Sequence, residues 1–328
     1  MTNQKKTMVL IDAYSQIFRA FFAIRMLNNS RGEPVNAAYV FTKLLMQIDA
    51  RYPSDYGAML FDCGKVAFRR ELAPEYKANR PPMPDALKQQ MPLIREISGA
   101  FGWDMFQCEG YEADDLIGAM TERHRDLPVF IVSGDKDLSQ LVDDRVSMLV
   151  PAGGSAGFTV RGRAEVEEKF GVAPELMVDY LALLGDASDN IPGVSGIGPK
   201  GAAEILRRLG GAENWLDHPE KIDPEDKLGK KLLPGLETVR RNRALIRLRT
   251  EYPAGWSGEP PVRRRPDWGQ IARICRDNQF NSILKDLPVA DPPENPQKKE
   301  PEAMDLFAFA AAADHAADEQ KEVQGELF

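Results

Sequence analysis

The sequence predicts an α/β protein built on a mostly parallel sheet, followed by a helical region. Over residues 8–150, short apolar runs alternate with amphipathic helical patterns, which is the arrangement that βαβ units produce. The pattern becomes mainly helical over 163–286, and beyond it the chain is rich in proline, alanine and charge without periodicity. We therefore expect an α/β core over 1–170, a helical lobe over 171–287 and a disordered acidic tail over 288–328.

Each expected element rests on a local pattern. Apolar runs predict strands at residues 8–11, 56–61, 103–107 and 128–133, and two runs around a Gly-Gly-Ser turn predict a hairpin of 146–150 with 157–160. Helical periodicity predicts helices at 14–24, 35–50, 84–100, 112–124 and 137–142. Two more helices, 175–184 and 199–209, are expected on either side of a glycine-rich loop.

The composition is typical of a soluble globular protein in a reducing compartment. Hydrophobic residues make up 43% of the 328 residues, and no apolar run approaches the length of a membrane span. The three cysteines and three histidines are far apart and show no zinc-type spacing. We expect a cytoplasmic protein without a membrane partner, and nothing in the sequence demands more than a monomer.

The net charge of −8 is unevenly distributed along the chain. Residues 288–328 hold ten acidic and three basic residues, so residues 1–287 are nearly neutral, with 40 acidic and 39 basic residues. Nine of those 40 belong to the acidic set described next, and without them the body is basic. A basic surface around an acidic pocket is compatible with a phosphate-backbone ligand.

Acidic residues at the ends of predicted strands and the starts of predicted helices are the strongest functional signal. They are Asp12, Asp62, Glu112, Asp114, Asp115, Asp135, Asp137, Asp186 and Asp189. The carboxyl ends of parallel strands share one edge of a sheet, so these side chains are expected to meet there. Carboxylates in one pocket repel one another unless cations neutralise them, and Mg²⁺ takes oxygen ligands of this kind. Two such ions are the usual apparatus for displacement at phosphorus, so we predict a metal-dependent phosphodiesterase.

Each acidic segment also has a purely structural interpretation. Glu112, Asp114 and Asp115 open a helix, where carboxylates commonly cap backbone N–H groups. Asp135 and Asp137 follow a Ser-Gly turn and also fit helix capping, and the pair at 186 and 189 fits a turn. Five such segments in these positions together favour a metal site over separate structural roles.

A glycine-rich loop between the two helices of the lobe is the second signal. Gly193, Gly196 and Gly198 permit a tight turn whose N–H groups can approach a phosphate at the start of a helix, and Lys200 adds charge there. The pattern predicts a helix–hairpin–helix over about 185–209 that binds the DNA backbone independently of sequence. A plain helix–loop–helix turn is the alternative. Backbone carbonyls of the loop are also candidate ligands for a monovalent cation such as K⁺.

Basic and aromatic side chains are interleaved after the strand that ends at Asp62. They are Arg69, Arg70, Tyr76, Lys77, Arg80 and Lys88. Such a segment suits contact with a nucleic-acid backbone and stacked bases. Lys77 and Arg80 are placed to neutralise charge developing on a phosphate oxygen. A solvated charged loop is the alternative.

Together these segments resemble the 5′-nuclease domain of bacterial DNA polymerase I, within the wider flap endonuclease family. The resemblance covers about residues 8–287, with the motifs in the family's order. The motifs are Ile11-Asp12, Phe61-Asp62, Phe68-Arg69 and the stretches 76–84, 110–115, 134–138 and 185–194. All nine carboxylates of the family are present, so the resemblance indicates an active, metal-dependent relative.

The resemblance implies a PIN-like core with a helical arch over about 64–100, followed by the helical lobe. A first metal ion would be held by Asp12, Asp62, Glu112 and Asp114, with Asp115 nearby. A second would be held by Asp135, Asp137 and Asp189, with Asp186 in support. Lys77 and Arg80 would be catalytic cations of the arch. Two Mg²⁺ ions, or Mn²⁺, would serve in hydrolysis that leaves a 5′-phosphate.

The same resemblance implies a role in primer removal and DNA repair at the nucleoid. The expected substrates are 5′ flaps, nicked or gapped duplexes and RNA primers. Ala13 and Tyr14 follow the first aspartate where the family often has glycine, and we expect a local change of backbone there rather than lost activity. No proofreading or polymerase domain follows the lobe, so we expect either a stand-alone nuclease or a separated domain, and the tail favours the stand-alone nuclease.

The last five residues, Gln-Gly-Glu-Leu-Phe, resemble a bacterial sliding-clamp-binding peptide. The expected contacts are Gln324, Leu327 and Phe328. An apolar Leu-Phe pair on a polar disordered segment can dock in a hydrophobic pocket and raise the local concentration of the enzyme. Chance similarity, or packing of the terminal residue pair on the body of the protein, is the alternative, because a five-residue match is short.

Two other functions compete with a structure-specific DNA nuclease. One is a PIN-type ribonuclease, but such ribonucleases usually lack both the helix–hairpin–helix and the long arch segment. The other is a DNA-junction binder without catalysis, which would gain nothing from nine repelling carboxylates facing phosphate. Both arguments favour the nuclease.

Overall fold

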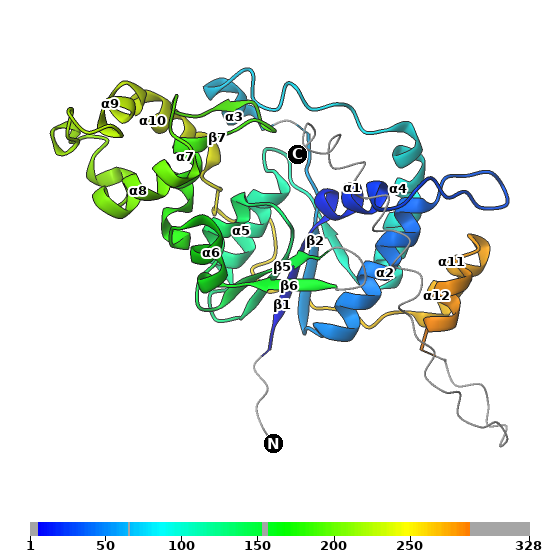
Figure 1. Cartoon of the computed structure of the whole chain (residues 1–328). Helices are drawn as coiled ribbons and strands as arrows, with labels where there is room; N and C mark the ends of the chain where they lie inside the picture. The colour runs from blue at the N-terminus through cyan, green and yellow to red at the C-terminus, as the bar shows by residue number, and fades with distance from the viewer. Residues whose placement is uncertain (1–5, 65, 153–156, 289–328) are drawn as a thin grey trace, which may run out of the picture.

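A computed structural model describes residues 6–64, 66–152 and 157–288 of the chain (Figure 1). Its centre is a six-stranded sheet with the strand order β3-β2-β1-β4-β5-β6. The strands are β1 (Met8–Asp12), β2 (Tyr56–Leu60), β3 (Asp104–Phe106), β4 (Val129–Val132), β5 (Val146–Pro151) and β6 (Phe158–Arg161). Each begins and ends within one residue of a predicted strand.

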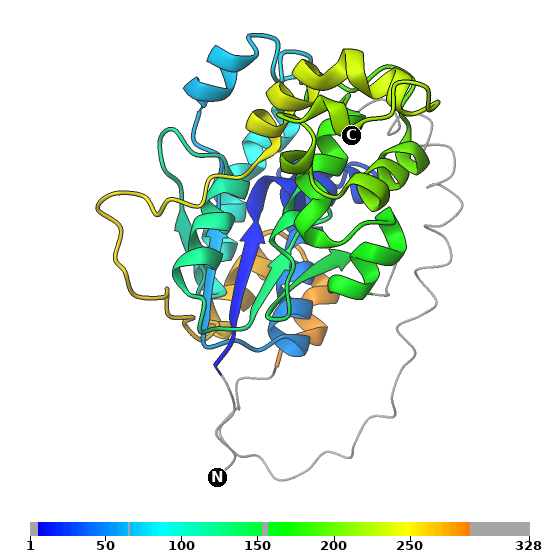
Figure 2. The same ribbon diagram turned by 90° about the vertical axis from the view of Figure 1, so that its left-hand side faces the viewer.

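The first five strands are parallel, and β6 pairs with β5 in the antiparallel sense. β1 lies at the centre, with Met8 opposite Tyr56 of β2 and opposite Val129 of β4. The carboxyl ends of these strands therefore emerge together, at what we name the carboxyl edge. Figure 2 shows the arrowhead of β1 pointing toward the green and yellow helices of the lobe. The predicted class, a mostly parallel sheet flanked by helices, is confirmed.

Helices cover both faces of the sheet. They are α1 (Ala13–Ala23), α2 (Asn36–Arg51), α4 (Asp85–Ala100) and α5 (Ala113–Arg123), each within one residue of its predicted bounds. Val9 and Ile11 of β1 belong to the core that contains α1, α2 and α4. Met8 and Leu10 belong to the opposite core, with α5 and the lobe. Because successive strand residues face opposite sides and both sides are covered, the strands are continuous apolar runs.

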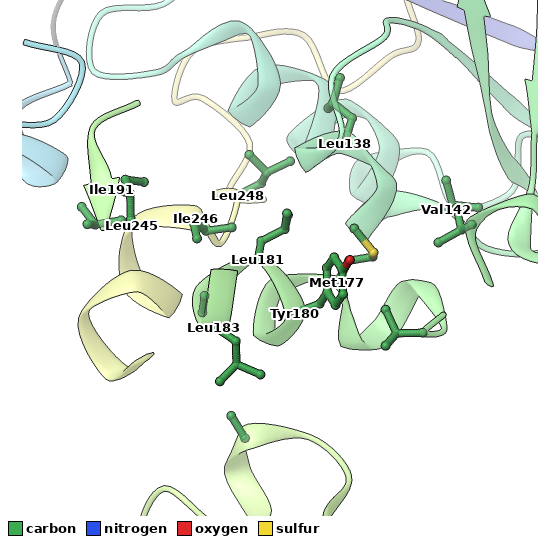
Figure 3. Packing of buried hydrophobic residues seen from close by; sticks show 14 of the residues in the cluster. Leu138, Val142, Met177, Tyr180, Leu181, Leu183, Ile191, Leu245, Ile246 and Leu248 are labelled. Carbon is green, nitrogen blue, oxygen red and sulfur yellow. The ribbon is translucent and has the colours of Figure 1, made fainter. Parts of the chain in front are cut away.

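The lobe is helical and stands over the carboxyl edge (Figures 1 and 2). α6 (Arg163–Phe170) leads into it, and its helices are α7 (Met177–Leu184), α8 (Pro199–Leu209), α9 (Gly229–Leu232) and α10 (Leu236–Ile246). Figure 3 shows Leu181 of α7 gathered with Leu138 of the 3₁₀ helix η1 (Asp137–Leu141) and with Ile246 of α10. The same apolar cluster continues into the sheet, so the lobe and the sheet share one core.

Two predicted boundaries need correction. The sequence places α11 (Trp268–Asp277) and α12 (Asn281–Asp286) in the lobe. In the structure they belong with α4 to the core on the other face of the sheet, which also contains α1 and α2 (Figure 1). Since α4 also belongs to that core, only the part of the predicted arch before residue 85, with α3 (Ala67–Leu72), crosses the carboxyl edge. Helical periodicity identifies the apolar face of a helix but not its partner, which explains both differences.

The predicted disordered tail lies outside the described residues, apart from its first residue, Pro288. Residues 153–156, the turn of the predicted hairpin, also lie outside them, although its two strands are present as β5 and β6. Among the residues that the structure does describe, no helix is both long enough and apolar enough to cross a bilayer.

A short hairpin connects α7 to the glycine-rich loop and places the last two aspartates of the acidic set. β7 (Gly185–Asp186) pairs with β8 (Ile191–Pro192). Gly185 ends α7 with φ 72° and ψ −176°, a region open essentially to glycine alone. A Cβ at this position would lie 2.3 Å from the backbone nitrogen of Gly193 and from the carbonyl oxygen of Ile191. Both the backbone conformation and the neighbouring strand therefore exclude a side chain here.

Gly185→Ala should destabilise the protein strongly. Alanine adds about 1–2 kcal/mol of backbone strain at positive φ, and its overlap with β8 forces the hairpin to shift. Gly110→Ala is the matched control, because Gly110 has φ 80° but no atom within 4 Å of the added Cβ. Urea unfolding measures both variants. Equal losses of unfolding free energy would show that the close approach of the strands does not matter.

Candidate metal centre at the carboxyl edge

Polar groups of neighbouring segments hold the aspartates that follow the central strands. Asp12 ends β1 and caps α1, and its Oδ1 accepts the N–H of Ser15 at 3.3 Å while its Oδ2 accepts the Ser133 hydroxyl at 2.9 Å. Asp62 follows β2, and its Oδ1 accepts the N–H of Ala113 at 2.8 Å. These bonds bring the ends of β1 and β2 together with the turn after β4 and the start of α5.

Further carboxylates converge on the same edge from α5, from the turn after β4 and from the lobe. They are Glu112 and Asp114 at the start of α5, Asp135 after β4, Asp137 at the start of η1, and Asp186 and Asp189 in the β7–β8 hairpin. Carboxylate oxygens of Asp137, Asp186 and Asp189 lie within 4.8 Å of one another. With Asp12 and Asp62, four segments of the core and one of the lobe thus contribute to a single acidic site.

Burial and mutual repulsion make several of these carboxylates poor acids. Burial, followed by repulsion from Asp62 and Asp135, raises the pKa of Asp12 to about 7. Burial and then the charge of Asp12 raise the pKa of Asp114 well above its ordinary value, and burial and then Asp135 do the same for Asp137. A divalent cation relieves both effects because it replaces lost solvation and neutralises the repulsion. The donor set of carboxylate oxygens fits Mg²⁺ or Mn²⁺.

Asp186 differs because groups of the chain already stabilise its charge. Burial alone would raise its pKa, but hydrogen bonds from Lys136 and Ser188 outweigh burial, and the pKa of Asp186 lies below its ordinary value. Lys136 Nζ lies 2.5 Å from its Oδ2, and the Ser188 hydroxyl lies 2.6 Å from its Oδ1. Sequence reasoning missed Lys136, although it stands between two aspartates of the predicted set. Asp186 is therefore stable as an anion without a metal ion.

Asp115 is not available as a metal ligand, which corrects its place in the predicted metal set. It is 0% exposed, and its two oxygens accept from the two Nη atoms of Arg69, each at 2.7 Å. The backbone N–H groups of Glu112 and Arg249 add bonds of 3.1 and 2.9 Å. Four donors saturate the four lone-pair positions of this carboxylate. Asp115 instead fixes the start of α5.

Arg69 and Tyr76, predicted as DNA contacts, are both buried. Arg69 is 1% exposed and also donates to Glu112 at 3.0 Å and to the carbonyl oxygen of Leu245 at 2.9 Å. Tyr76 is 6% exposed, and its hydroxyl donates to Glu112 at 3.0 Å. A buried arginine needs charged partners, so this part of the basic and aromatic pattern reflects an internal ion-pair network. Both side chains hold Glu112 in place rather than facing a ligand.

Lys77 and Arg80 lie at the acidic site and can be reached from solvent. Lys77 Nζ is 2.8 Å from Glu112 Oε1 and 3.8 Å from Asp189 Oδ2, and an Nη atom of Arg80 is 2.5 Å from Asp189 Oδ1. The Lys77 side chain is 19% exposed and that of Arg80 is 49% exposed. Burial would lower the pKa of Lys77, but Glu112 and Asp189 outweigh burial and raise it. The ammonium group therefore stays charged.

The segment around Lys77 is docked on the hairpin of the lobe. The N–H of Lys77 donates to the carbonyl oxygen of Asp189 at 3.0 Å, and Asn190 Nδ2 donates to the carbonyl oxygen of Glu75 at 2.9 Å. Lys77 and Asn190 have φ of 54° and 59°, a conformation that costs a non-glycine residue about 1–2 kcal/mol. The bonds between the two loops hold this strained backbone, so each loop positions the other.

The glycine-rich loop exposes polar backbone at the start of α8. Gly196, Gly198 and Lys200 are exposed, and Gly196 has φ 75°. Gly193 is required for a close approach instead, because a Cβ there would lie 2.0 Å from the carbonyl oxygen of Leu184. Lys88, another of the predicted DNA contacts, is not part of this loop. It is an exposed residue in the first turn of α4.

Family models for a known exonuclease match most of the chain. The model described as the N-terminal resolvase-like domain of 5′-3′ exonuclease matches residues 7–171, and the model of its C-terminal SAM fold matches residues 172–267. The 5′-3′ exonuclease of Aquifex aeolicus is 36% identical over 284 residues, which cover 86% of this chain and 95% of that protein. DNA polymerase I of Bacillus caldotenax is 36% identical over 310 residues, covering 94% of this chain but only 34% of the polymerase.

Solved structures share the fold at lower identity. A T5 5′-exonuclease with bound zinc ions has a TM-score of 0.61 and 23% identity, over 86% of this chain and 99% of that one. The catalytic core of Rad2 in complex with DNA substrate has a TM-score of 0.59 and 16% identity, over 86% and 92%. At these identities the likeness establishes the fold.

Arg69→Met should destabilise the protein far more than loss of a surface charge. It leaves Asp115 buried without its guanidinium partner, which typically costs about 3–5 kcal/mol. Arg70→Met is the control in the same helix, because Arg70 is only half-buried. Urea unfolding of both variants measures the difference. Similar losses would contradict the central role of the Arg69–Asp115 pair.

The raised pKa of Asp12 predicts that Mg²⁺ stabilises the protein more above neutral pH than below it. The folded protein keeps a proton on Asp12 up to about pH 7, whereas the unfolded chain loses it near 3.8. Without metal, stability therefore falls as the pH rises through this window. A divalent cation takes the place of the proton, so the stabilisation by Mg²⁺ grows as the pH rises over the same range.

Melting temperatures with Mg²⁺ and with EDTA, at about pH 5.5 and about pH 8, measure this effect. Asp12→Asn is the control variant. In EDTA at the higher pH it should melt above the wild type, because a buried repelling charge is gone. It should also respond less to Mg²⁺. An equal Mg²⁺ shift at both pH values in the wild type would contradict the assignment.

Proposed function

The chain belongs to the 5′-3′ exonuclease family of metal-dependent nucleases, and from that premise we propose that it cuts DNA as a structure-specific 5′-3′ exonuclease and flap endonuclease. The predicted family and enzyme class are confirmed. The chain spans about a third of the polymerase relatives, so we extend only a nuclease activity to it. We propose 5′ flaps, nicks and RNA primers as substrates, in primer removal and repair.

The observation that carries this proposal is the gathering of buried carboxylates from separate segments at one sheet edge. Among the described residues, Arg69, Lys77, Arg80 and Lys136 contact members of the set, fewer cations than there are carboxylates. Divalent ions complete the neutralisation, and an acidic metal site in an otherwise basic body suits a phosphodiester substrate.

We assign the carboxylates to two Mg²⁺ ions. Asp12, Asp62, Glu112 and Asp114 would hold the first, and Asp135, Asp137 and Asp189 would hold the second, with Asp186 in support. When bound, the ions lower the pKa of water and neutralise charge on the scissile phosphate and the leaving oxygen. Asp115 is excluded because Arg69 and two backbone N–H groups saturate it.

The chain's own groups orient these ligands and stabilise negative charge. The Ser133 hydroxyl and the N–H of Ala113 fix the carboxylates of Asp12 and Asp62. We propose that Lys77 and Arg80 donate to the scissile phosphate, because they are partly exposed at the site. Their bonds to carboxylates keep them charged and near the reacting atoms until a phosphate competes for them.

We propose that the glycine-rich loop binds the DNA backbone away from the cut. Exposed N–H groups at the start of α8 suit a phosphate oxygen, and Lys200 adds charge beside them. Arg70 and Lys88 are further candidate contacts with the backbone, since neither is fully buried.

A 5′-labelled flap duplex should be cut at or near the flap junction with Mg²⁺ and not with EDTA. Asp135→Asn should lower kcat by more than about a hundredfold, because loss of a residue that only supports a metal ligand already costs up to about that much. DNA affinity should stay the same or improve, because a negative charge that faces phosphate is removed. Lys77→Ala should lower kcat by about 10²–10³-fold, as loss of one charge-stabilising donor does, with a smaller change in affinity.

Single-stranded RNA cut in the same assay provides the contrast. Cleavage of RNA without cleavage of the flap would make the protein a ribonuclease of the PIN type. Tight flap binding with no product in any divalent metal would make it a junction binder. Full activity of Asp135→Asn would contradict the two-metal assignment.

We also propose that residues 324–328 dock on a bacterial sliding clamp. Gln324, Leu327 and Phe328 lie outside the described residues, so the proposal rests on the sequence Gln-Gly-Glu-Leu-Phe. Deletion of these five residues should abolish capture of the chain by purified clamp and leave cleavage of a short flap substrate unchanged. Undiminished capture of the shortened chain would refute clamp docking.

A further inference from the structure

Residues 228–235 pack against the glycine-rich loop, although they are more than a helix away from it in the sequence. A Cβ on Gly235 would meet the Val194 side chain at 2.6 Å, so the two segments are in close contact. Within this stretch, Lys231 of α9 lies over the loop. Its side-chain carbons and Nζ would be 3.2–3.3 Å from a Cβ on Gly196.

The Lys231 ammonium group donates to the loop backbone. Its Nζ lies 2.6 Å from the carbonyl oxygen of Gly196, a short distance that is typical of a charge-assisted bond. The loop is closed on itself by the N–H of Ile197, which donates to the carbonyl oxygen of Val194 at 3.1 Å. A positive charge is therefore fixed on the turn of the hairpin.

Lys231 and its neighbour Lys230 are used differently. Lys230 Nζ pairs with Glu225 at 3.0 Å and is exposed. Among the described residues, no carboxylate forms a salt bridge with Lys231, and its side chain donates to the Gly196 carbonyl oxygen. An ammonium has three N–H donors, and a single carbonyl takes one of them. The charge of Lys231 is thus directed to the loop and is not cancelled there.

This arrangement does not fit a separate K⁺ ion on the loop, which the sequence alone leaves open. The Gly196 carbonyl oxygen already accepts a hydrogen bond from the Lys231 ammonium group, which carries one positive charge. A second unit charge at the same oxygen would meet repulsion of about 1–4 kcal/mol at 4 Å, between bulk water and the protein surface. Lys231 therefore opposes a second monovalent cation at the Gly196 carbonyl oxygen.

We propose that Lys231 is the built-in cation of the DNA-binding loop, taking the place that a K⁺ ion would otherwise fill and offering its remaining N–H groups to a DNA phosphate. The inference rests on the proposed function, because it requires that the loop bind DNA. Gly196 and Gly198 are exposed beside Lys231, so a phosphate bound by the loop would lie near its ammonium group. DNA binding should then be independent of which monovalent cation is in solution.

Fluorescence anisotropy of labelled duplex DNA with the full chain tests this, in potassium and in tetramethylammonium chloride at equal ionic strength. Wild-type affinity should agree within about twofold between the two salts, since only ionic strength acts on it. Lys231→Met should bind several-fold more weakly and with a salt slope reduced by about one, as loss of one phosphate contact predicts. In this variant K⁺ should restore part of the affinity. Lys230→Met is the matched control and should behave like the wild type.

Wild-type binding that is several-fold tighter in K⁺ would overturn the proposal, and so would identical behaviour of the Lys231→Met and Lys230→Met variants. A readout without DNA separates this proposal from the proposed function. In equilibrium dialysis with thallium(I), a K⁺ surrogate, and with Mg²⁺ in excess at the carboxyl edge, Lys231→Met should take up more thallium than the wild type. No difference between these two proteins would overturn the proposal even if DNA binding fails altogether.

Discussion

Like-charge repulsion at the carboxyl edge is the constraint on which the rest of the site depends. Strand ends, the start of α5 and a hairpin of the lobe each deliver carboxylates to the same place, and burial deprives those carboxylates of water. The raised pKa values of Asp12, Asp114 and Asp137 express this cost directly. The fold tolerates the acidic site because hydrogen-bond donors and cations of the chain stabilise part of the negative charge, and divalent ions can neutralise the rest.

The cations of the site differ in how firmly the fold holds them, and this difference separates structural from chemical roles. Arg69 is enclosed, bonds both oxygens of Asp115 and serves the architecture of α5. Lys77 is more exposed than Arg69, and Arg80 is more exposed than Lys77. Both contact carboxylates that are themselves candidate metal ligands. In the proposed function, a substrate phosphate competes for these two but not for Arg69, which is buried. A residue's position in a basic run therefore says little about its role until its burial is known.

Local patterns predicted the sheet, most helices and the acidic set, because strand alternation and strand-end position are encoded within a few residues. They could not predict that Arg69 and Tyr76 turn inward, since the same letters describe a charged surface and a buried ion-pair network. They also could not assign α11 and α12 to the core. Lys231 carried no signal at all, because its importance comes from a contact with Gly196, which is 35 residues away. The unpredicted features are all tertiary contacts.

Because the Lys77 segment docks on the β7–β8 hairpin, the acidic site needs segments that the ribosome makes at different times. The sheet, α5 and the first seven carboxylates are complete in the N-terminal half, but Asp186 and Asp189 emerge later, and the backbone N–H that completes Asp115 belongs to Arg249. A nascent chain that has exposed only its sheet thus has an acidic edge that lacks Asp186 and Asp189. The full acidic set is therefore assembled only after the lobe has been translated and has folded onto the core.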